Sequence, residues 1–225
     1  MSERSHSIRY TEAVESFVEF ARTLTDDEWA THVPCTPLWT ARDVLSHVSG
    51  LPDDGIAGRM EGAPGEAWTQ SQVERNAELT VDELLTRLTS QYEMFGGVLD
   101  QIGEGRPPLD CHSHEHDVRQ AVGRPGNQDS AIIDDASKLM LLGLADLPVG
   151  LTVTFDDRSE HVLGATDGAS SATLSVSKFD MFRSRLGRRT RDQVRAFDWS
   201  GDDDAVESAM AGWFMFGPSE IAIAE

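Results

Sequence analysis

The sequence predicts a mainly helical domain over residues 1–148, followed by a small α+β domain over residues 149–225. Apolar residues recur at helical spacing in several segments before Pro148. Those segments begin at capping residues and end at glycine or proline. After Pro148, apolar and polar residues alternate as they do in a half-buried strand. We therefore expect a helical bundle and then a short sheet with helices.

The first helix is predicted over residues 7–25 from one apolar stripe: Tyr10, Val14, Phe17, Val18, Ala21 and Leu24. A second helix start follows at Thr25, and this short helix is expected to end near Val33. Residues 34–39 contain two prolines and predict a stiff turn.

Thr40, with Asp43 three residues later, is a good helix start. The helix that follows is expected to run to Leu51 and to hold His47 at the edge of its apolar face. Residues 52–70 are rich in Gly, Pro and Asp and predict a loop, and residues 71–79 predict a short helix.

Thr80 and Glu83 form a capping box that opens a long helix to Ile102. Gly96 and Gly97 in its interior would let another helix approach closely. The next helix spans Pro107 to Gly123. Asp129 or Ser130 then caps a helix to about Leu147, which completes a set of helices typical of a bundle.

The second domain is predicted to contain three strands and two helices. The strands are expected at residues 151–155, 160–165 and 171–176, separated by Asp/Gly turns. Helical spacing resumes over residues 178–187 and 204–216.

The composition is that of a globular protein, with 39% hydrophobic and 26% charged residues among 225. The net charge of −20 argues against nucleic acid and anionic membranes as partners. The chain has no apolar run of about 18 residues and no apolar core of a signal peptide. Neither Cys35 nor Cys111 requires a disulfide, so a cytoplasmic location is expected. The oligomeric state stays open.

The helix from Pro107 to Gly123 carries three of the seven histidines. At 100° per residue, Asp110 and His114 lie together at the edge of its apolar face, with Asp117 one turn on. His112 and His116 point to the opposite side and are expected to face water.

His47, Asp110 and His114 therefore form a candidate metal site on two helices. Two imidazoles and one carboxylate leave a coordination position open, as catalytic zinc sites require, although iron or nickel would also suit them. The alternatives are a half-buried His47 that bonds a backbone carbonyl and a surface hydrogen bond between Asp110 and His114.

A basic segment stands out in the second domain. Lys178 to Arg195 contains seven basic residues and only two acidic ones. Because arginine binds carboxylates through two parallel hydrogen bonds, the segment favours an anionic small molecule. A solvated face that pairs with the acidic remainder of the chain is the alternative.

The chain contains the motifs PCTPLWTARDVLSHVSG at residues 34–50 and DCHSHEHDVRQAVG at residues 110–123, and a basic stretch at residues 182–199. Together they resemble the family of actinobacterial mycothiol-dependent enzymes typified by maleylpyruvate isomerase. Residues 34–50 are similar to its segment Pro-Cys-x-x-x-Trp-Thr-x-x-Asp-Val-x-x-His. Residues 110–123 resemble its second motif, and residues 182–199 resemble its second domain. The resemblance covers nearly the whole chain.

The resemblance implies a DinB-like four-helix bundle followed by a small sterol-carrier-like α+β domain. It also implies a divalent metal, usually zinc, held by His47, Asp110 and His114. The family's type enzyme has glutamate at the position of Asp110, which is one methylene shorter. Asp117, and less so Asp43, would orient a ligand histidine.

The implied function is a metal-dependent thiol enzyme. It would activate mycothiol for addition or S-transfer to a small electrophilic, anionic substrate. One or more of Arg183, Arg188 and Arg189 would hold a substrate carboxylate, with surface ion pairs as the alternative. Two other functions remain open: a cis–trans isomerase of the maleylpyruvate-to-fumarylpyruvate type, and a non-catalytic ligand-binding module with a vestigial metal site.

Overall fold

The chain folds into two compact units. The structure, a computed structural model, describes residues 4–165 and 170–225. Contacts between its residues divide the chain into Met1–Gly126 and Asn127–Glu225. This division differs from the boundary predicted at residue 148, because the helix α7 (Ala131–Leu142) packs against α8 (Lys178–Arg185) of the second unit.

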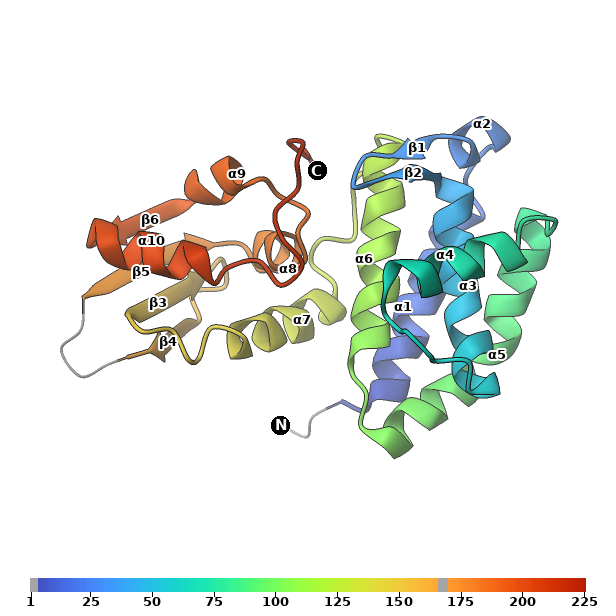
Figure 1. Ribbon diagram of the computed structural model, residues 1–225, viewed down its shortest axis with the longest axis horizontal. Coiled ribbons are helices and arrows are strands. Elements are labelled where there is room, and N and C mark those ends of the chain that lie inside the picture. Colours follow the sequence, from blue (N-terminus) through green and yellow to red (C-terminus); the bar gives the residue numbers. More distant parts are fainter. Residues whose placement is uncertain (1–3, 166–169) are drawn as a thin grey trace. The chain divides into compact units, whose positions relative to one another are not determined.

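Long helices that run alongside one another form the first unit (Figure 1). They are α1 (His6–Ala21), α3 (Ala41–Ala57), α5 (Val81–Ile102) and α6 (Arg106–Ala121). Both α1 and α3 contact α5 on one side and α6 on the other, which closes the four into a bundle. The apolar stripes predicted from the sequence fill its interior, with members such as Phe17, Leu45, Leu88 and Val118 fully buried.

Three threonines start helices as their sequence context predicts. Thr25, Thr40 and Thr80 each accept a hydrogen bond from the backbone three residues on, and an acidic side chain at that position bonds back. The long helix α5 ends at Gly103, whose φ of 67° suits glycine. These local signals fix where α3 and α5 begin and therefore which faces they bury.

The segment between α1 and α4 differs from its prediction. The short helix α2 (Asp26–Trp29) ends four residues before Val33, and β1 (His32–Val33) pairs with β2 (Thr36–Thr40) where a turn was expected. Helix α3 continues through Pro52 to Ala57, and α4 (Glu66–Arg75) starts five residues early. The residues from Val48 to Pro52 are buried, so tertiary packing outweighs the helix-breaking tendency of this stretch.

The second unit contains one four-stranded sheet with the order β4-β3-β5-β6. The predicted strands are confirmed as β3 (Gly150–Phe155), β4 (Glu160–Gly164) and β5 (Ser171–Val176), and β6 (Asp198–Gly201) was not predicted. Strands β3 and β5 are parallel, and the other neighbours are antiparallel.

Helices complete this unit. Helix α10 (Asp203–Ala211) packs on the sheet, while α8 contacts α7, and α9 (Arg191–Arg195) is a further short helix. Ser130 caps α7, which ends at Leu142 and so falls short of the predicted end near Leu147. Among the residues that the structure describes, none of the helices combines the length and apolar character that a bilayer crossing requires.

Candidate metal centre

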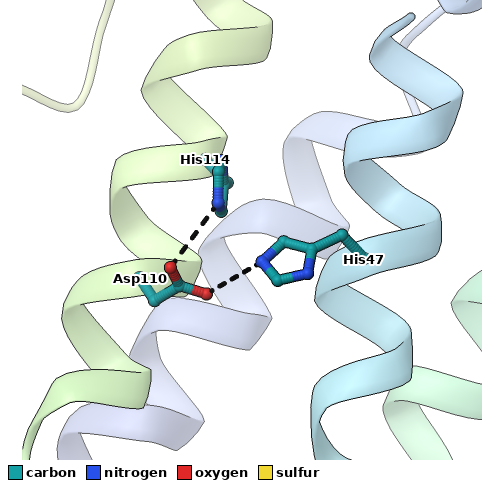
Figure 2. A group of neighbouring side chains, drawn as sticks. All are labelled: His47, Asp110 and His114. Atoms are coloured by element: carbon teal, nitrogen blue, oxygen red, sulfur yellow. Dashed lines mark ion pairs between the residues drawn. The ribbon is translucent and has the colours of Figure 1, made fainter. Parts of the chain in front are cut away.

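The three predicted ligand residues come together inside the first unit, from two neighbouring helices (Figure 2). His47 lies in the second turn of α3, whose start is fixed by the capping box of Thr40. Asp110 and His114 lie one turn apart on α6, whose first turn contains two prolines. Because α3 and α6 pack side by side, the edges of their apolar faces meet.

The geometry is compact. The Nε2 atom of His47 lies 3.3 Å from Oδ2 of Asp110, and Nε2 of His114 lies 3.5 Å from Oδ1. The ligand atoms of all three residues lie within 4.8 Å of one another. Both imidazoles are buried, whereas the Asp110 side chain is 38% exposed, so solvent reaches the group at the carboxylate.

The three groups influence one another's charge. Partial removal of the Asp110 carboxyl from water tends to raise its pKa, but the attraction of His114 and hydrogen bonds from both histidines lower the pKa below its ordinary value. Burial opposes protonation of His114, yet Asp110 and Asp117 together raise its pKa to about 9. Without a metal, the group therefore holds a carboxylate and a positively charged imidazole at neutral pH.

Each histidine has a partner at its other ring nitrogen. The Nδ1 atom of His114 lies 2.9 Å from Oδ2 of the buried Asp117. The Nδ1 atom of His47 lies 2.6 Å from Oε1 of Gln72, on α4. Gln72 was not predicted, because the sequence shows only a polar residue in a short helix. A ring nitrogen held in this way is typical of metal-binding histidines.

Aromatic side chains flank His47. The ring centres of Trp39 and Trp68 lie 5.5 Å and 6.4 Å from that of its imidazole. Trp39 comes from β2 and Trp68 from α4. They place His47 in an apolar environment, which strengthens electrostatic interactions at the group.

The prediction that His112 and His116 face water is wrong. Both are buried, because α6 packs against α1 as well as α3. Their Nε2 atoms lie 3.3 Å apart, and His112 lies 3.4 Å from the carboxylate of Glu115. That carboxylate also accepts hydrogen bonds of 2.7 Å from Ser16 and Arg119. A helical wheel that assumes one buried face does not predict that the opposite face of α6 is buried as well.

Asp43 and the three predicted arginines have other partners. The Asp43 carboxylate accepts the backbone N–H of Thr40 at 2.9 Å in the capping box.

In the second unit, Arg183 and Arg189 pair with the Glu225 carboxylate at 2.7 Å and 2.6 Å. Arg189 also pairs with Asp180, and Arg188 donates to the Leu186 carbonyl. These guanidinium groups thus bind acceptors of the chain itself, and a role for them towards substrate stays a prediction.

The donor set fits a divalent transition metal. Two imidazole nitrogens and one carboxylate oxygen are the ligands that zinc takes in catalytic sites, and they leave at least one position free. All three donors converge, and a polar partner orients each histidine. Iron and nickel accept the same donors, so the residues do not select among these metals.

Comparisons with known proteins show which family and which fold this chain resembles. Residues 10–125 match the family described as "Mycothiol maleylpyruvate isomerase N-terminal domain". The fold is similar to the crystal structure of the mycothiol-dependent maleylpyruvate isomerase, with a TM-score of 0.51, 12% identity, and coverage of 81% of this chain and 88% of that one. The crystal structure of a histidine-to-alanine variant of that enzyme matches with a TM-score of 0.50 and 11% sequence identity, over the same shares of the two chains. A comparison with curated protein sequences finds no match.

Proposed function

This chain belongs to the family of the mycothiol maleylpyruvate isomerase N-terminal domain, and from that premise we propose that it is a metal-dependent enzyme that uses mycothiol. The observation that carries the proposal is the convergence of His47, Asp110 and His114, with Asp110 open to solvent. A solvent-accessible side of the group is what a catalytic metal needs, whereas a structural metal is enclosed by four protein ligands.

The three residues would hold a divalent metal, and the family resemblance favours zinc among the metals that accept these donors. A free thiol has a pKa of about 8.5, so little of it is thiolate at neutral pH. The bound metal would supply a Lewis acid that favours the thiolate form of mycothiol.

The residues around the group have separate tasks in this proposal. Asp117 holds His114 with its Nε2 atom towards Asp110. Trp39 and Trp68 limit the access of water to His47. The mycothiol sulfur would add to a small electrophilic and anionic substrate, or displace a leaving group from it. One or more of Arg183, Arg188 and Arg189 would contact a substrate carboxylate. Measurement of KM in Arg188→Ala tests this contact, and we expect KM to increase.

The first experiment is elemental analysis of the purified protein, followed by an assay of thiol consumption with mycothiol and a panel of electrophiles. We expect one divalent metal per chain and thiol loss with at least one electrophile. Conversion of maleylpyruvate to fumarylpyruvate without net thiol loss would instead identify a cis–trans isomerase. A metal-loaded protein with no turnover on any substrate would identify a ligand-binding module, and a protein that binds no divalent metal would contradict the proposal.

A further inference from the structure

A chain of buried polar contacts leads away from His47. The Oε1 atom of Gln72 lies 2.6 Å from Nδ1 of His47. The amide nitrogen of the same Gln72 donates to Oδ2 of Asp54 at 2.9 Å. Both Gln72 and Asp54 are completely buried, so water does not offer them alternative partners.

Two arginines keep Asp54 ionised. Arg75 donates to its Oδ1 atom at 2.6 Å, and Arg59 donates to the same atom at 2.8 Å. Burial tends to raise the pKa of Asp54, but the hydrogen bonds from Arg75, Gln72 and Arg59 outweigh burial and lower it. An ionised carboxylate only accepts hydrogen bonds.

The direction of each hydrogen bond follows from this charge. Because Asp54 only accepts, the NH2 group of Gln72 must face it, and the amide oxygen must face His47. An amide oxygen also only accepts, so Nδ1 of His47 must carry the proton. Because Nδ1 is engaged by Gln72, Nε2 is the nitrogen left to bind a metal, and Nε2 is the atom that lies 3.3 Å from Asp110.

We propose that Gln72 is a positioning residue of the metal centre, which Asp54 fixes in the one amide orientation that directs the Nε2 lone pair of His47 to the metal. This inference rests on the proposed function, since it assumes a metal at the site. It deepens that function, because α4 thereby becomes part of the site although it contributes no ligand.

The packing of α3 against α4 favours this role. Gly50 lies one turn after His47, and a Cβ at this position would lie 2.8 Å from Cβ of Gln72. The glycine therefore admits Gln72 between the helices at the level of His47. The two histidines also differ, because His114 is held by a carboxylate and His47 by an uncharged amide. The metal centre thus gains only one negative charge from these partners.

The test compares Gln72→Leu, which removes the acceptor, with Gln72→Glu. The carboxyl introduced by Gln72→Glu would hold a proton on the oxygen that faces the Asp54 carboxylate, because two carboxylates this close do not both ionise, and its other oxygen would still accept from His47. Gln91→Leu is the matched control, because Gln91 bonds Asp53 on the same helix as Asp54 but does not touch His47. Zinc affinity is measured by competition with a chromophoric chelator, and thermal unfolding confirms that each variant folds. In protein labelled with 15N-histidine, the Nδ1–H signal of His47 reports the ring proton directly, with and without zinc.

We expect Gln72→Leu to weaken zinc binding about tenfold, as the loss of a ligand's hydrogen-bond partner does elsewhere. Gln72→Glu and Gln91→Leu should stay within about threefold of the wild type. The Nδ1–H signal should be slow to exchange in the wild type and in Gln72→Glu, and exchange rapidly in Gln72→Leu.

Equal zinc affinity in Gln72→Leu and the wild type, or equal losses in Gln72→Leu and Gln72→Glu, would overturn the inference. So would a His47 without a proton on Nδ1 in the wild type. A wild-type protein with the Nδ1–H signal but no zinc affinity would show the inferred orientation and contradict only the proposed function.

Discussion

Zinc should displace a proton from His114, and the affinity for zinc should therefore rise steeply with pH. Asp110 and Asp117 raise the pKa of this imidazole to about 9. A metal and a proton compete for the same nitrogen, because only the neutral imidazole is a ligand. The perturbation is a change of pH from 7 to 8.5.

The magnitude follows from the pKa. At pH 7 the group is two pH units below its pKa, so only about 1% of His114 is neutral. The apparent zinc affinity should then be about 100-fold below its limit at high pH, which corresponds to about 2.7 kcal/mol. Between pH 7 and 8.5, the logarithm of the affinity should increase by about one for each pH unit.

Calorimetric titration in buffers of different ionisation enthalpy measures the number of protons released. We expect about one proton per zinc at pH 7 from His114. Asp117→Asn removes one of the charges that raise the pKa of His114, so the steep part of its curve should move to lower pH. A zinc affinity that is flat over this window, with no proton released, would refute the reasoning.

Three further predictions concern stability. In the metal-free protein, the raised pKa of His114 contributes stability that is complete below the unfolded pKa of about 6.5 and lost as pH rises through about 9. Thermal unfolding temperatures should fall over that window, and less so in His114→Gln. Glu115→Gln should lower the free energy of unfolding by about 1–3 kcal/mol in urea titrations at pH 7, because the buried carboxylate accepts hydrogen bonds from Ser16 and Arg119. Since the pKa of Glu115 is lowered to about 2, this loss should shrink as pH falls from 4.5 towards 2. Gly55→Ala should lower the free energy of unfolding by about 1–3 kcal/mol, because the new methyl group would overlap the Phe95 ring. Gly97→Ala, on an open helix surface, should raise it by about 0.5–1 kcal/mol. Equal urea midpoints for the two variants would contradict this.

The parts of the fold that local sequence signals control were predictable. Thr40 and Thr80 cap helices as expected, and the start of α3 that Thr40 fixes places His47 on the face where it is observed. The i, i+4 spacing of Asp110 and His114 placed both on one face, and Asp117 followed from the same wheel. These features depend on geometry within one helix.

The features that depend on contacts between helices were not predictable. Pro52 and its neighbours predicted a loop that included Asp54, but packing overrides this local tendency and α3 continues through Pro52. Gln72 gains its role only when α4 packs beside Gly50. His112 is buried because α6 has a second packed side against α1. The spacing of apolar residues within one helix does not reveal which other helices it contacts.

The assignment of the metal centre is tested most directly by zinc titrations of the metal-free wild type, His47→Ala and His114→Ala, side by side with His161→Ala. His161 lies on β4, outside the group, and controls for adventitious binding to histidine. We predict one tight site per chain in the wild type and in His161→Ala, and its loss in both ligand variants while they remain folded. A wild-type protein that binds zinc no more tightly than folded His47→Ala would contradict the assignment of His47, Asp110 and His114 as the metal centre.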